Sequence, residues 1–348
     1  MSMLEKYLED LEKRIDPAVE NSLFNEWKDF CDGRSTSAIF SPRRPKKCPP
    51  AIVWPETSIN AALDSYELMA VQQLKTCSDA LKDGSGMLLN VRCNYGTSIL
   101  PTVFGAQLFV MDEKLNTLPT SKPVGANTIE AIIEKGIPGL SNGLGGRVFE
   151  MANKFCELFE AYSCIKQHVR IFHPDLQGPM DVCEVLYGSD LFVDLLTKPD
   201  LLKRLLSLIT ETYIAFMKKW ELLVPFTDQY STHWSMLHRG HLMIRDDSAM
   251  NLSPNMFVEF VRPYDQKLLS AFGGGAIHFC GRGDHFIEHA SQMKGLYAIH
   301  MSQPECNDLE AIFRSTIDNN IKLLALKREV AEDAMRKGRD LRHCVHCW

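Results

Sequence analysis

The feature that most constrains this chain is an alternation of short apolar runs with longer amphipathic stretches along most of its 348 residues. Short apolar runs predict buried strands, and the amphipathic stretches between them predict helices, a pattern typical of βα units around a parallel sheet. Eight strands close a (β/α)8 barrel. The sequence therefore predicts an α/β fold, a (β/α)8 TIM barrel, with strands at 51–54, 87–92, 169–173, 229–233, 241–245, 276–279, 296–300 and 322–326.

Two regions fall outside a minimal barrel. Residues 1–50 are predicted to form a helical N-terminal extension, and residues 51–348 the barrel, as a single domain overall. Residues 97–125 are predicted to form a β-hairpin insertion after the second strand. Helix signals support the remainder: Ser58 is a candidate N-cap of a helix that ends at Gly84, and Pro199 opens a long helix.

Composition excludes several classes of protein. The net charge of -6 and the pI near 6.0 provide no basic field, so nucleic acid is not expected as a partner. No apolar run reaches the roughly 18 uncharged residues of a membrane span, and the N-terminus lacks the apolar core of a signal peptide. The 11 scattered cysteines are typical of thiols in a reducing compartment. We expect a cytoplasmic enzyme with a small-molecule substrate, without a membrane partner.

Polar side chains follow most of the predicted strands. Active sites of barrels are built at the C-terminal ends of the strands, so these residues are the candidates for chemistry and binding. Asp247 could orient a neighbouring histidine or act as a general acid, although a surface aspartate that caps a helix is the alternative. The predicted catalytic residues are Asp247, Asp175 and Tyr95, and the predicted substrate-binding residues are Arg92, Asn94, Trp54, His173, Gln177 and His238.

The sixth predicted strand delivers His278 and Cys280 to one point. Side chains two residues apart on a strand share a face, so an imidazole and a thiol are aimed together, which suits zinc. The spacing alone is weak, because a chain with 11 His and 11 Cys produces such a pair readily by chance. Its place at a strand end gives it weight.

Several short motifs give the chain a family resemblance. Gln177-Gly178-Pro179 before an apolar helix, and the glycine-rich approach to His278-Phe279-Cys280-Gly281, resemble the uroporphyrinogen decarboxylase superfamily over residues 50–330. Further motifs that carry the resemblance are Tyr187-Gly188-Ser189, Lys198-Pro199-Asp200, and Leu252-Ser253-Pro254 with Phe257 and Pro263. The resemblance implies a (β/α)8 barrel with a cleft at its C-terminal face.

The superfamily holds two chemistries, and the resemblance is closer to its corrinoid and zinc methyltransferase branch. True uroporphyrinogen decarboxylases have an Arg-rich segment after the first strand, whereas this chain has Trp54-Pro55-Glu56-Thr57-Ser58 there. The methyltransferase branch binds zinc through His-x-Cys and a distant Cys, which implies that His278 and Cys280 are ligands. In that branch zinc activates a thiol that exchanges a methyl group with a corrinoid, here expected on a separate partner protein.

The third zinc ligand is open on the sequence. Cys306 follows the seventh predicted strand and is favoured over the adjacent Glu305, with Cys344 and Cys347 of the C-terminal tail as further alternatives. The function expected is zinc-dependent methyl transfer between a methylated small substrate or thiol and a corrinoid. The alternatives are a metal-free decarboxylase of a carboxylated, porphyrinogen-like substrate and a non-catalytic corrinoid- or tetrapyrrole-binding protein. A monomer and a homodimer are both compatible with the sequence.

Overall fold

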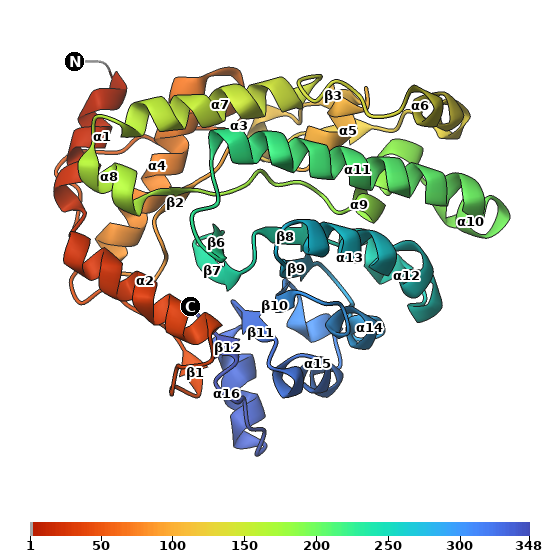
Figure 1. Cartoon of the computed structure of the whole chain (residues 1–348). Helices are drawn as coiled ribbons and strands as arrows, with labels where there is room; N and C mark the ends of the chain where they lie inside the picture. Colours follow the sequence, from red (N-terminus) through yellow and green to blue (C-terminus); the bar gives the residue numbers. More distant parts are fainter. Residues whose placement is uncertain (1–2) are drawn as a thin grey trace.

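A parallel sheet forms the centre of a mixed α/β fold, and helices cover it (Figure 1). The computed structural model describes residues 3–348. Six strands pair side by side, all in parallel, so that the N-terminal β1 joins the C-terminal β12. In sheet order they are β1 (Ile39–Phe40), β12 (Val345–His346), β11 (Lys322–Leu324), β10 (Leu296–Met301), β9 (Gly275–Phe279) and β8 (Leu242–Arg245).

A second parallel pair, β2 (Asn90–Val91) and β5 (Arg170–Ile171), continues the arrangement. Among residues 3–348 no strand ladder joins this pair to the six-stranded sheet. Instead, the amide of Met243 on β8 donates to His173 Nε2 at 3.0 Å, and the amide of Gly178 donates to the Arg245 carbonyl at 2.8 Å. The order of parallel strands is consistent with a TIM-barrel-like fold in which side-chain and loop hydrogen bonds replace a ladder between β5 and β8.

The segment predicted as the fourth barrel strand, 229–233, is instead half of an antiparallel hairpin. β6 (Tyr230–His233) pairs with β7 (Met236–Arg239) across a two-residue turn. Met236 and Leu237 belong to the same buried core as inward-facing residues of the sheet, such as Met243 of β8. A short polar segment such as 229–233 can form either a barrel strand or one strand of a hairpin. The packing of Met236 and Leu237 in the core selects the hairpin.

The strand predicted at 51–54 is wrong. The segment lies between prolines, which donate no ladder hydrogen bond, and Val53 is 90% exposed. Trp54 packs on Tyr7 of the first helix and donates to Asp10 at 3.0 Å. In place of this segment, β1 and β12 take part in the sheet. The predicted N-terminal extension therefore supplies two helices and a strand. Its residues 1–2 lie outside the described part.

The predicted β-hairpin insertion within 97–125 is confirmed as β3 (Gln107–Phe109) and β4 (Thr120–Lys122), which pair antiparallel. Ser65 breaks the predicted helix after Ser58 in two, because its side chain caps a second start, and Gly84 ends it with φ +64°. Within residues 3–348, no helix has the length and apolar content needed to cross a bilayer.

The α-helices are α1 (Met3–Arg14), α2 (Pro17–Cys31), α3 (Ile59–Asp64), α4 (Tyr66–Asp83), α5 (Ile99–Val103), α6 (Ile129–Lys135), α7 (Leu144–Phe159), α8 (Ser163–His168), α9 (Pro179–Tyr187), α10 (Leu191–Thr197), α11 (Pro199–Leu223), α12 (Pro254–Phe260), α13 (Arg262–Ala271), α14 (Ile287–Ser291), α15 (Leu309–Ser315) and α16 (Arg328–Arg336). Short 3-10 turns are η1 (Glu113–Leu115), η2 (Ala126–Thr128), η3 (Asp247–Asn251), η4 (Pro304–Cys306) and η5 (Ile317–Asn319). Of these turns, η3 and η4 follow β8 and β10 at the strand ends where active sites of this architecture lie.

Candidate metal and substrate site

The candidate site lies at the C-terminal ends of three neighbouring strands. Arg245 ends β8, His278 lies near the end of β9, and His300 lies near the end of β10. The sheet register pairs His278 with both of the others, so the three side chains start from adjacent positions. This register, which depends on strand pairing between distant segments, brings the polar groups together.

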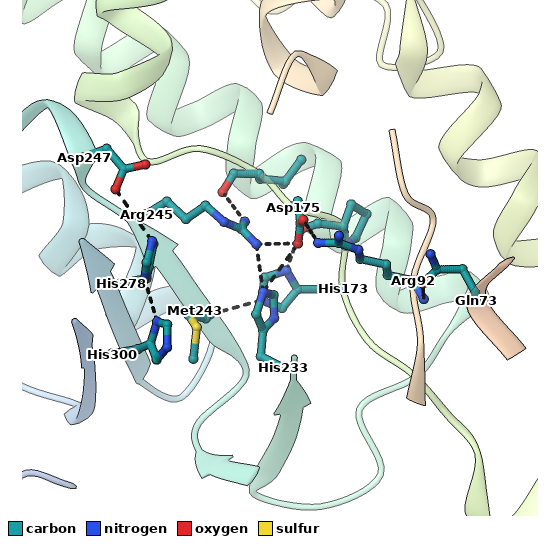
Figure 2. A network of polar contacts seen from close by, with 12 residues as sticks. Gln73, Arg92, His173, Asp175, His233, Met243, Arg245, Asp247, His278 and His300 are labelled. Atoms are coloured by element: carbon teal, nitrogen blue, oxygen red, sulfur yellow. Dashed lines mark hydrogen bonds and ion pairs between the residues drawn. The ribbon is translucent and has the colours of Figure 1, made fainter. Parts of the chain in front are cut away.

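Three potential metal ligands converge here. One ligand atom each from Asp247, His278 and Cys280 lies within 4.8 Å of the other two. Cys280 Sγ is 3.4 Å from His278 Nε2. His278 Nε2 is 3.7 Å from Asp247 Oδ1 (Figure 2). A nitrogen, a thiol and a carboxylate form a donor set that fits zinc, for which three protein ligands leave one position open in catalytic sites. The Asp247 side chain is 36% exposed, so the group faces solvent on one side.

The backbone holds Asp247 toward Cys280. The Cys280 amide donates to Asp247 Oδ1 at 2.7 Å. The carboxylate of Asp181, in the first turn of α9, accepts from the amides of Asp247 at 3.0 Å and Ser248 at 2.8 Å. The Cys280 amide thus holds the Asp247 side chain, and Asp181, to which the sequence assigned no role, holds the backbone of η3 that carries it.

His300 holds the other side of His278. Their Nδ1 atoms are 2.7 Å apart, so one ring donates to the other (Figure 2). Burial, with smaller contributions from His300 and Arg245, lowers the pKa of His278 to about 3, so its ring is neutral at physiological pH. When His278 donates through Nδ1, the lone pair of its Nε2 faces Asp247 and Cys280, as a metal ligand requires.

The Cys280 thiol keeps its proton without a cation. Burial is the main reason that the pKa of Cys280 is raised, and the Ser302 hydroxyl, 3.6 Å from Sγ, opposes the shift. Thiols bind metals as thiolates, so binding of a cation would release this proton.

A buried ion cluster adjoins the ligand group. The Asp175 carboxylate forms ion pairs with Arg92 and Arg245, and His233 Nε2 lies 3.5 Å from Asp175 Oδ1 (Figure 2). Burial favours the neutral acid, but Arg245 and Arg92 outweigh it and hold the pKa of Asp175 below its usual range. Asp175 is thus an ionised counter-ion rather than a proton donor. Burial also keeps the pKa of His233 well below its usual value, so His233 is neutral. The Asp175 carboxylate is therefore the counter-ion of two cations, the guanidinium groups of Arg92 and Arg245.

Below η3 lies a second group of buried carboxyls. Asp246 and Asp265 are both 1% exposed, and their carboxyl groups interact with each other. Burial is the main cause that raises the pKa of Asp265 to about 8 and the pKa of Asp246 well above its usual range. The pair therefore retains protons at neutral pH.

Of the four candidates for a third ligand, none joins the pair in the described residues. Cys306 is exposed on η4, and Glu305 forms an ion pair with Lys327 at 2.9 Å. Cys344 accepts from Lys322 Nζ at 3.3 Å, and Cys347 is buried beside β12. Asp247, predicted as a catalytic residue, occupies the third position instead, because β8 and β9 are neighbours in the sheet.

The remaining predicted residues divide into two groups. Tyr95, Asn94 and Gln177 are buried at the strand ends, and among residues 3–348 the side-chain oxygens of Asn94 and Gln177 lack a hydrogen-bond partner. His173 donates through Nδ1 to the Pro174 carbonyl and accepts from the β8 backbone. His238 donates from β7 to the Arg239 carbonyl, and Trp54 packs on α1, so these three have structural partners.

Comparison with known proteins supports the fold. No family model and no curated protein matches the sequence. The structure is similar to that of a methyltransferase from Methanosarcina mazei, with a TM-score of 0.64, 16% sequence identity, and coverage of 93% of this chain and 92% of that chain. The similarity thus extends over nearly the whole of both chains.

Proposed function

We propose that this chain is a zinc-dependent methyltransferase that moves a methyl group between a small substrate or thiol and a corrinoid. The observation that carries the proposal is the convergence of Asp247, His278 and Cys280 at the strand ends. The fold supports it, since the similar protein from Methanosarcina mazei is a methyltransferase. The sequence resemblance to the methyltransferase branch of the uroporphyrinogen decarboxylase superfamily adds the corrinoid.

The three side chains would hold zinc, which supplies a Lewis acid that makes a thiol nucleophilic near neutral pH. His278 contributes a neutral ring whose orientation is fixed by His300. Asp247 contributes a carboxylate held by the Cys280 amide and, through its own amide, by Asp181. With Asp247 as the third ligand, the donor set has one sulfur rather than the two implied by the resemblance.

The ion cluster would bind the substrate. The buried guanidinium group of Arg245 and the partly buried one of Arg92 share one carboxylate, which leaves one positive charge without a carboxylate partner in the described residues. An uncompensated buried charge is costly, and an anionic group of a ligand would neutralise it. The Arg92 side chain is 21% exposed and can donate to such a group. A separate corrinoid protein would dock over the strand ends, with the methyl group delivered to the open side near Asp247.

Metal analysis of the full chain, purified without chelators, tests the metal site. We expect about one zinc per chain. His278→Ala, Cys280→Ala and Asp247→Asn should each lower the zinc content, whereas the matched control Cys306→Ser should leave it unchanged. Loss of zinc in Cys306→Ser and not in Asp247→Asn would show that the third ligand was assigned wrongly. Full zinc content in Cys280→Ala would refute the site.

Methyl transfer is tested with methylcobalamin as the donor and two thiols of similar size, anionic 3-mercaptopropionate and neutral 2-mercaptoethanol. The absorption change of the corrinoid reports demethylation. We expect turnover that requires zinc, and a KM in Arg92→Gln that rises for the anionic thiol only. Release of CO₂ from a porphyrinogen carboxylate by metal-free protein would favour a decarboxylase, and corrinoid binding without turnover would favour a binding protein.

A further inference from the structure

The turn of the β6–β7 hairpin has a backbone that its residues do not favour. Trp234 and Ser235 both have positive φ, 46° and 65°, between the paired residues His233 and Met236. Two-residue hairpin turns with positive φ at both positions belong to asparagine and glycine, because a larger side chain crowds the backbone. A tryptophan here is strained, and such strain persists only where the surroundings hold the residue.

The turn is held in place from outside the hairpin. The amide of Leu88 donates to the Ser235 carbonyl at 2.9 Å, and the Ser235 hydroxyl donates to Asn90 Oδ1 at 3.3 Å. Both contacts tie the turn to the region of β2. Met236 and Leu237 fill the apolar core below the turn, and Trp234, only partly buried, packs against the edge of that core.

The indole ring also reaches the site. Its centroid is 4.9 Å from the His278 ring at an interplanar angle of 86°, and 5.2 Å from the His300 ring. The Arg245 guanidinium carbon lies 4.7 Å from the same ring. Trp234 thus lies between the potential metal ligands and the arginine cluster, and it touches both imidazoles of the 2.7 Å hydrogen bond.

We propose that Trp234 is a positioning residue that holds the His278 ring so that Nε2 faces Asp247 and Cys280. An edge-to-face contact resists rotation of the imidazole about its last side-chain bond. The hydrogen bond that His278 Nδ1 donates to His300 fixes one nitrogen, and the indole fixes the plane of the ring. The importance of this orientation for a metal rests on the proposed function, whereas the orientation itself belongs to the protein alone.

Imidazole nitrogen chemical shifts of the full, metal-free chain labelled with ¹⁵N-histidine test the orientation. The His278 signals are assigned by their loss in His278→Gln. In the native chain we expect one fixed tautomer. The double variant Trp234→Asn with Ser235→Gly keeps an ideal turn and removes the indole, and we expect the two His278 nitrogens to average. Ser235→Gly alone is the matched control and should keep the native signals.

Binding of Co²⁺ alone to the same full-length variants gives the second readout, through the visible bands of the ion. We expect the double variant to bind about tenfold more weakly, with altered bands, as for loss of other groups that orient a ligand. Trp234→Phe retains an aromatic edge and should keep most of the native affinity for Co²⁺. The melting temperature of the double variant should not fall, because its turn is unstrained.

Native His278 signals in the double variant would overturn the positioning role. The proposed metal site fails separately, if the native chain binds no Co²⁺. In that case the nitrogen shifts of the metal-free variants still decide whether Trp234 orients His278.

Discussion

Asp265 gives a stability prediction whose sign is opposite to that of an ordinary loss of a buried polar group. Its carboxyl is buried and interacts with that of Asp246. In Asp265→Asn a neutral amide of the same shape replaces the ionisable carboxyl. The amide NH₂ group can donate a hydrogen bond to Asp246. We therefore expect Asp265→Asn to stabilise the fold at neutral and basic pH.

The magnitude follows from linkage. Burial is the largest contribution that raises the pKa of Asp265 to about 8, whereas an aspartate in an unfolded chain titrates near 3.9. Between these values the native carboxyl keeps a proton that the unfolded chain releases, so the free energy of unfolding falls as pH rises. Each pKa unit corresponds to about 1.4 kcal/mol, which sets an upper limit of about 4 kcal/mol at pH 7. Partial relaxation around the carboxyl makes about 1–4 kcal/mol the expected gain.

Guanidinium unfolding at pH 4, 6 and 8, followed by circular dichroism, measures the effect. The gain in Asp265→Asn should be small at pH 4 and grow toward pH 8. The control is Asp175→Asn, another buried aspartate, which should lose about 3–5 kcal/mol because two arginines would share no carboxylate. A loss of stability in Asp265→Asn that is equal at all three pH values would refute the reasoning, since it would mean that folding does not raise the pKa of this carboxyl.

Three further substitutions test other parts of the structure. Asp181→Asn should weaken zinc binding by about tenfold in a competition titration with a chromophoric chelator, because one acceptor for the η3 amides that position Asp247 is lost; unchanged affinity would remove Asp181 from the site. Gly275→Ala should lower stability by more than about 3 kcal/mol in urea unfolding, because a Cβ would lie 2.0 Å from the Leu242 carbonyl oxygen in the neighbouring strand; a stable variant would mean that β8 and β9 are not paired as described. His346→Ala should cost about 2–4 kcal/mol by thermal unfolding, because its ring packs in the core and accepts a backbone hydrogen bond at 3.0 Å; a native melting temperature would contradict the burial of β12.

Periodicity in the sequence identified the elements that are long or strongly patterned. β8, β9, β10 and β11 lie within or beside the predicted segments, and α11 begins at Pro199 as predicted. These segments are regular because each buries one face or both against the rest of the chain, so the pattern of apolar residues records their environment. The inserted hairpin β3–β4 was found for the same reason.

Short strands escaped because two residues cannot show a period. β1 and β12 contain two residues each, and they acquire their role only by pairing with each other and with β11. The antiparallel course of β6 and β7 escaped too, because a strand pattern carries no information on the direction of its partner. The prolines that flank residues 51–54 disfavour a strand there, whereas the apolar residues between them favour one, and the prediction followed the apolar residues.

The sequence by itself determined the α/β class, the long helices, and the His278-x-Cys280 pair at a strand end, because propensity and spacing act within one segment. Only the tertiary structure decided which third donor joins that pair, since Asp247 and Cys306 both follow strands that neighbour β9 and differ in how their loops fold. It also decided the contacts of Trp234 and His300 with His278, and the raised pKa of Asp265. Each of these depends on the distance and burial of groups far apart in the chain, which no local pattern records.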